Sequence, residues 1–109
     1  MEGLKHTKGP WVLGKTDSDV WTKDNLWIAG VAGSDGDGLA NARLIATAPE
    51  MLESLIKAYR ELIGVSRSQD WHSEAFRAVI EEMERTIEAA TNMKIEEVLE
   101  ATARQEAER

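Results

Sequence analysis

The stretch DGDGLANARLIATAPEMLESL, residues 35–55, joins two parts of the chain that have different hydrophobic patterns. Before it, short apolar runs are separated by Gly, Asp and Asn, which is typical of strands and tight turns. From Leu39 onward, apolar residues recur every three or four positions, as in a helix that buries one face. The sequence therefore predicts an α+β fold in which a small sheet is followed by helices.

Three strands are predicted within about residues 11–32, over 11–13, 19–22 and 26–31. The connecting loops, 14–18 and 23–25, are short enough for hairpins, so we expect a three-stranded antiparallel sheet. The third strand carries apolar residues on both faces, and a sheet of three strands is barely stable alone. We expect helices to cover one face and a partner or ligand to cover the other.

Helices are predicted over about residues 39–63, 73–91 and 94–103. Pro49 cannot donate a backbone hydrogen bond, and Thr47 and Glu50 have the spacing of a capping box. We therefore expect a short helix, a kink at Pro49, and a longer helix that ends at Gly64. The expected core-facing stripe of this segment is Leu44, Ala48, Met51, Leu52, Leu55, Tyr59 and Leu62, widened by Ile45, Ile56 and Ile63.

The length of 109 residues predicts one domain, 1–109, with flexible ends at about 1–10 and 104–109. The sequence has no cysteine, which excludes disulfides, thiolate nucleophiles and zinc sites built on cysteine. Neither a secretory signal nor a long apolar run is present, so we expect a cytoplasmic protein without a membrane partner.

The net charge is −7, and residues 74–109 hold ten acidic against five basic residues. A chain this acidic lacks the basic surface that neutralises phosphates, so duplex DNA is not an expected partner. An acidic helical face could instead mimic a nucleic acid. That hypothesis requires one contiguous face formed by Glu81, Glu84, Glu88, Glu96 and Glu100.

Catalytic chemistry has little support in the sequence. His72 could act as a general base, and Glu81 with Glu84 or Glu88 could hold a metal, but solvated side chains explain these residues better. Residues 35–38 lack the ligand pattern of a calcium loop and are interpreted as a turn. We expect no enzymatic activity, no catalytic residue, no metal and no cofactor.

The candidate ligand-binding residues are Trp11, Trp21, Trp27, Asn41 and Arg43. Three indoles in a small sheet cannot all be buried unless each N–H finds an acceptor, so at least one is expected to line a groove or interface. Asn41 and Arg43 are expected near the first turn of a helix, whose N–H groups attract anions. A base could stack on an indole while Arg43 holds a phosphate. The alternative is that the indoles form the core and Arg43 lies over the sheet.

Two motifs resemble a family of small, mostly uncharacterised proteins of tailed phages and prophages. They are His6 to Trp11 (HTKGPW here, HTPGPW in the family) and Asn41 to Glu53, which is similar to the family's NARLIAAAPELLEAL. The resemblance covers about residues 6–63 and implies phage origin, with no known enzymatic activity and no catalytic residue. Lys8 and Thr47 depart from the family's usual proline and alanine without implying another fold.

Three functional hypotheses follow. The leading one is a homo-oligomeric anti-defence protein of the host cytoplasm that sequesters a nucleotide-derived signal, such as a cyclic nucleotide or an ADP-ribose derivative. The second is a protein-binding inhibitor that acts as an acidic mimic of nucleic acid against a defence complex. The third is a structural or regulatory phage protein that only self-associates.

Overall fold

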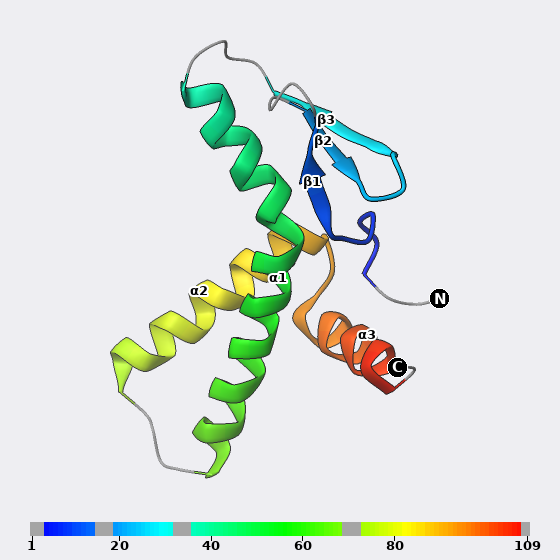
Figure 1. Cartoon of the computed structure of the whole chain (residues 1–109). Helices are drawn as coiled ribbons and strands as arrows, with labels where there is room; N and C mark the ends of the chain where they lie inside the picture. Colours follow the sequence, from blue (N-terminus) through cyan, green and yellow to red (C-terminus); the bar gives the residue numbers. More distant parts are fainter. Residues whose placement is uncertain (1–3, 15–18, 32–35, 69–72, 108–109) are drawn as a thin grey trace. The chain divides into compact units, whose positions relative to one another are not determined.

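The computed structural model describes residues 4–14, 19–31, 36–68 and 73–107. Three strands, β1 (Trp11–Leu13), β2 (Asp19–Thr22) and β3 (Trp27–Gly30), precede three helices (Figure 1). The helices are α1 (Gly36–Ser68), α2 (Glu74–Thr91) and α3 (Ile95–Ala107). The strands form one antiparallel sheet in the order β1-β2-β3, which confirms the predicted α+β arrangement.

The chain divides into two compact units. The sheet unit is Thr7–Met51, and the helical unit is Met1–His6 with Leu52–Arg109. Helix α1 contributes its first half to the sheet unit and its second half to the helical unit.

The β2–β3 hairpin is closed by local hydrogen bonds around the four-residue loop 23–26. The N–H of Thr22 donates to the carbonyl of Leu26 (2.8 Å), and the N–H of Leu26 donates to the Thr22 hydroxyl (3.0 Å). Asn25 has a φ of 69°, a left-handed conformation that asparagine tolerates better than most residues. Turn chemistry visible in the sequence therefore fixes this hairpin.

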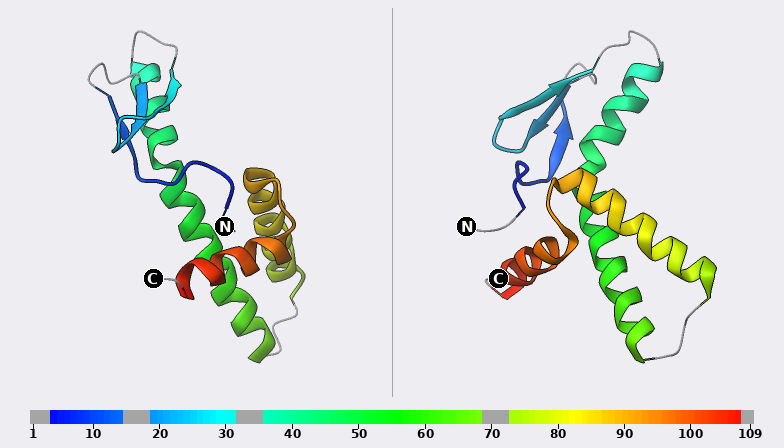
Figure 2. Two further views of the ribbon diagram at one scale, coloured as in Figure 1. Left: turned by 90° about the vertical axis from the view of Figure 1, so that its right-hand side faces the viewer. Right: turned by 180° about the vertical axis from the view of Figure 1, so that it is seen from behind.

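The core of the sheet unit is small. Val20 on β2 and Ala42 on α1 are both fully buried, and Pro49 is buried on the same helix. Figure 2 shows the first half of α1 running alongside the sheet. Gly9 approaches this helix closely, because a Cβ there would lie only 2.8 Å from the Cβ of Pro49.

The helical unit has the larger core, formed by the second half of α1 with α2 and α3. Its buried residues are Ile56, Tyr59, Ile87, Ile95 and Val98. The Tyr59 hydroxyl donates to the Glu84 carboxylate (2.6 Å) and so ties α1 to α2. The Arg60 guanidinium donates to the Leu99 carbonyl (3.1 Å) and to Glu106 (3.2 Å), and so ties α1 to α3.

The corner between α2 and α3 is capped by side chains. Asn92 ends α2 in a left-handed conformation, and its N–H donates to the Glu88 carbonyl (2.7 Å). The Glu88 carboxylate accepts from the N–H of Ile95 (2.8 Å), and Glu97 accepts from the N–H of Lys94 (3.0 Å). These bonds satisfy backbone donors that every helix start leaves unpaired.

Helix α1 differs from its prediction. It begins at Gly36, so the turn expected over 35–38 is wrong from Gly36 onward, and it continues through Pro49 and past Gly64. The Thr47 hydroxyl donates to the Arg43 carbonyl (2.8 Å) within the helix, so Thr47 and Glu50 form no capping box. Pro49 removes one helical hydrogen bond, but Ala42 and Ile56, seven residues before and after it, are buried and help to keep the helix intact.

Two other boundaries and part of the predicted stripe also differ. Helix α3 reaches Ala107 instead of ending near 103, because Arg104 pairs with Glu100 and Glu106 pairs with Arg60. Leu44 and Met51, expected to face the core, are 60% and 43% exposed. Part of the apolar surface of α1 is therefore left exposed by the rest of the chain.

Gly64 offers a test of the corrected helix. It is exposed inside α1, and nothing lies within 4 Å of the position a Cβ would take. Alanine loses less backbone entropy than glycine in a helix, so Gly64→Ala should stabilise the protein by about 0.5–1 kcal/mol. Urea denaturation followed by circular dichroism measures the change. Destabilisation would mean that Gly64 ends the helix after all.

Candidate binding surface

One face of the sheet presents a row of large apolar side chains. The register pairs Val12 with Trp21 and Trp21 with Trp27, and residues directly opposite in an antiparallel sheet share a face. Val12 is 38% exposed and Trp27 is 56% exposed, whereas Trp21 is partly buried. We call this row, Val12, Trp21 and Trp27, the open face of the sheet.

A glycine lies beside each of the two indoles, Gly14 directly after β1 and Gly30 at the end of β3, and at Gly14 a side chain would be too close. A Cβ at Gly14 would lie 2.7 Å from Nε1 of Trp21, and a Cβ at Gly30 would lie 3.5 Å from Cζ2 of Trp27. Both indoles therefore lie beside backbone that carries no side chain. The register shift between Val20 and Trp21 leaves Ile28 unpaired, which places Trp27 and Gly30 on the same face.

Trp11 belongs to the opposite face. It is paired with Thr22, which is buried, and its indole N–H donates to the Thr7 carbonyl (3.2 Å). Of the three predicted indoles, the sheet thus brings Trp21 and Trp27 together and separates Trp11 from them.

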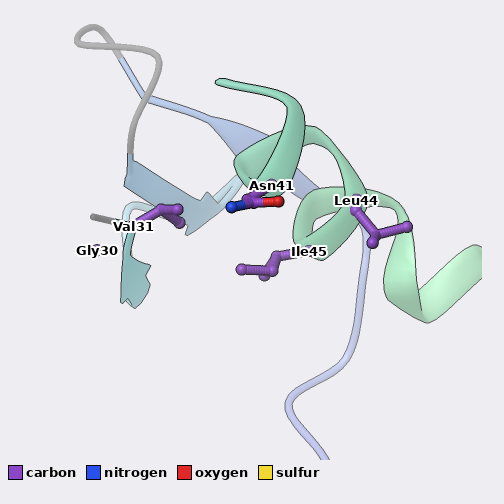
Figure 3. A pocket seen from close by; sticks show the side chains of 5 residues that line it. All are labelled: Gly30, Val31, Asn41, Leu44 and Ile45. Carbon is purple, nitrogen blue, oxygen red and sulfur yellow. The ribbon is translucent and has the colours of Figure 1, made fainter. Parts of the chain in front are cut away.

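A hollow of about 440 Å³ lies between the end of β3 and α1, and Gly30 borders both this hollow and the open face. It is lined by Gly30, Val31, Asn41, Leu44 and Ile45. Asn41 and Ile45 project toward Val31, whereas Leu44 points away from it (Figure 3). Asn41, which projects toward Val31, is itself exposed, so the hollow is open to solvent.

The predicted cationic group is not part of this hollow. Asn41 lines it, but Arg43 is exposed and does not, and neither do Trp11, Trp21 and Trp27. Because α1 begins at Gly36, Asn41 and Arg43 are its sixth and eighth residues, beyond the first turn where free N–H groups attract anions. The residues missed by sequence reasoning are Val12, Gly14 and Gly30 on the open face, and strand alternation was the available signal for them.

Within the described residues, no group of three His, Asp or Glu side chains is placed to hold a metal ion, and His72 lies outside the described ranges. Glu84 and Glu88 are engaged in hydrogen bonds with Tyr59 and Ile95. The other three carboxylates of the acidic mimic hypothesis, Glu81, Glu96 and Glu100, are exposed.

The fold and this surface define a small α+β protein with an aromatic sheet face. No helix among the described residues has the length and apolar character needed to cross a membrane. The chain belongs to the family of Salmonella phage P22 protein Y8K6, whose model matches residues 1–105. The expected membership of a family of small phage proteins is thus confirmed, and the match extends beyond the predicted range of 6–63. Neither a curated protein nor a solved structure matches it.

Proposed function

We propose that this phage protein is a non-enzymatic binding protein that holds a nucleotide-derived signal of bacterial immunity on the open face of its sheet. The observation that carries the proposal is the adjacent pair Trp21 and Trp27, with Trp27 more than half exposed. Aromatic side chains on a binding surface stack nucleobases and contribute about 1–3 kcal/mol per base. By holding the signal in the host cytoplasm, the protein would keep it from its receptor.

Stacking rather than phosphate binding is expected to supply most of the affinity. Arg43 lies on α1 and outside the described row of indoles, and Asp19, on β2 beside the open face, is acidic. A ligand with an accessible base and few phosphates suits this face better than a highly charged one.

Calorimetric titration tests the proposal with cyclic dinucleotides, cyclic trinucleotides and cyclic ADP-ribose variants. We expect at least one of them to bind the wild type. The Arg43→Ala substitution should raise the dissociation constant of this ligand by less than about tenfold, because a solvent-exposed charge contributes little to binding. Absence of binding with every compound contradicts the proposal.

A protein partner is the second candidate, favoured by the shape of the open face. Small-molecule sites are usually concave, and none of the residues in this row lines the hollow described above. Exposed tryptophans are frequent hot spots of protein interfaces. A host protein captured by the wild type but not by a Trp27→Ala variant, at both low and high salt, would favour this candidate. Capture lost only at high salt would favour the acidic mimic instead.

A further inference from the structure

A carboxylate lies beside both indoles of the open face. Asp19 is two residues before Trp21 on β2, so the two side chains project from the same face of the sheet. The Cβ of Asp19 lies 3.3 Å from the position that a Cβ at Gly14 would take, and Nε1 of Trp21 lies 2.7 Å from that position. Across the sheet, Asp19 is paired with Gly30, which lies beside Trp27.

The space between this carboxylate and the Trp27 ring is open. Oδ1 of Asp19 lies 3.7 Å from the position that a Cβ at Gly30 would take, and Cζ2 of Trp27 lies 3.5 Å from the same position. Gly30 has no side chain to fill it, and both Gly30 and Trp27 are exposed. A flat ring stacked on Trp27 can therefore reach the carboxylate with one edge.

The chemistry of a carboxylate limits which edge it can recognise. A carboxylate accepts hydrogen bonds through two oxygens and donates none. Its oxygens have about four lone-pair sites, so Asp19 can accept from a ligand in addition to bonds within the protein. Hydrogen bonds to a charged acceptor are also stronger than those between neutral groups. The edge that suits Asp19 best has two adjacent N–H donors and no acceptor that faces the carboxylate.

Guanine is the common base that presents such an edge, because its N1–H and its 2-amino group are adjacent donors. Adenine and cytosine place an acceptor nitrogen of the ring beside their amino group, and uracil has one N–H between two carbonyls. Each of these three offers the carboxylate one donor and sets an acceptor against it. We propose that the signal carries a guanine base, stacked on Trp27 and recognised by Asp19; this rests on the proposed function, that a nucleotide binds the open face.

The 3′,5′-cyclic mononucleotides of guanine, hypoxanthine and adenine test the proposal, because they differ in the base alone. Titration is followed through the indole N–H signal of Trp27 in a ¹⁵N–¹H spectrum. We expect the adenine compound to bind at least about tenfold more weakly than the guanine compound, since a site built for N–H donors rejects a base that lacks them. The hypoxanthine compound keeps N1–H without the 2-amino group and should fall between them.

Two results of this titration separate the inference from the proposed function. Equal binding of the guanine and adenine compounds overturns the guanine assignment and leaves nucleotide binding in place. If no cyclic mononucleotide binds, the guanine assignment is wrong. The proposed function is then contradicted as well only if the cyclic dinucleotides, cyclic trinucleotides and cyclic ADP-ribose variants also fail to bind.

Asp19→Asn should change which base is preferred. The amide has the size of the carboxylate but replaces one acceptor oxygen with an NH₂ donor. Xanthine complements that amide, because its N1–H donor lies beside a carbonyl at C2. We expect the variant to bind the guanine compound at least about tenfold more weakly than the wild type, and the xanthine compound about fivefold more tightly. A general disturbance of the sheet cannot produce that gain, and its absence overturns the role of Asp19.

Asp24→Asn is the matched control. Asp24 is exposed in the loop between β2 and β3, and its substitution removes the same charge from the same hairpin. The ratio of the guanine and adenine dissociation constants should stay within about twofold of the wild type. An equal effect of the two variants would attribute the preference to net charge. Arginine amide is the competing ligand, since a guanidinium also has paired donors and stacks on aromatic rings. If it binds at Trp27 more tightly than the guanine compound, the open face recognises a basic protein and the proposal is overturned.

Discussion

Ile87→Ala is expected to lower the free energy of unfolding of the helical unit by about 2–5 kcal/mol, the usual cost of removing this much buried side chain. Ile87 is fully buried and lies in the core where the second half of α1 meets α2 and α3. Truncation leaves a cavity that neighbouring helices refill only in part. Urea denaturation followed by circular dichroism at 222 nm measures the loss of helical structure.

Val79→Ala is the control for this prediction. Val79 is on the same helix, α2, but is 47% exposed, so its truncation should change the stability by less than about 0.5 kcal/mol. If both variants lose the same free energy, or Ile87→Ala loses none, the described core of the helical unit is incorrect.

Trp27→Ala is expected to weaken the binding of a stacked nucleotide by roughly ten- to a hundredfold, the equivalent of losing one stacked base. The indole is 56% exposed and lies beside Gly30, so the sheet does not depend on it for burial. The loss of binding should therefore come without a comparable loss of stability. Calorimetry on the ligand that binds the wild type provides the comparison.

Leu26→Ala is the matched control for Trp27→Ala. Leu26 immediately precedes Trp27 and is equally exposed, at 56%, but it offers no aromatic ring. We expect its truncation to leave the affinity within about twofold of the wild type, as for other surface changes. Equal weakening by the two variants would attribute the effect to general disturbance of the hairpin and contradict stacking on Trp27.

Much of the fold could be predicted because the sequence patterns that determine it involve residues close together in the chain. Turn residues such as Asn25 mark the hairpin, and the change from strand to helix periodicity after Gly30 places the sheet before the helices. The course of α1 was less predictable. Proline and glycine usually interrupt helices, but here both Pro49 and Gly64 lie within one helix. Buried side chains on either side of Pro49, Ala42 and Ile56, offset the hydrogen bond that it removes.

The candidate site was predictable in composition but not in geometry. The sequence indicated indoles in the sheet, but which of them share a face depends on register. One unpaired residue, Ile28, aligns Trp27 with Trp21, and strand alternation turns Trp11 the other way. The exposure of Leu44 and Met51 could not be predicted either. Hydrophobic periodicity shows that a helix face is apolar, but it does not show whether other parts of the same chain cover that face.

The indole N–H signals of the protein test most directly whether the open face is the binding surface. In a two-dimensional ¹⁵N–¹H spectrum, each signal is assigned by single substitutions to phenylalanine and followed during titration with the nucleotide panel. We expect the signals of Trp21 and Trp27 to shift together with a saturating ligand while that of Trp11 stays in place. Shifts confined to Trp11, or none with any nucleotide, would contradict the proposed function.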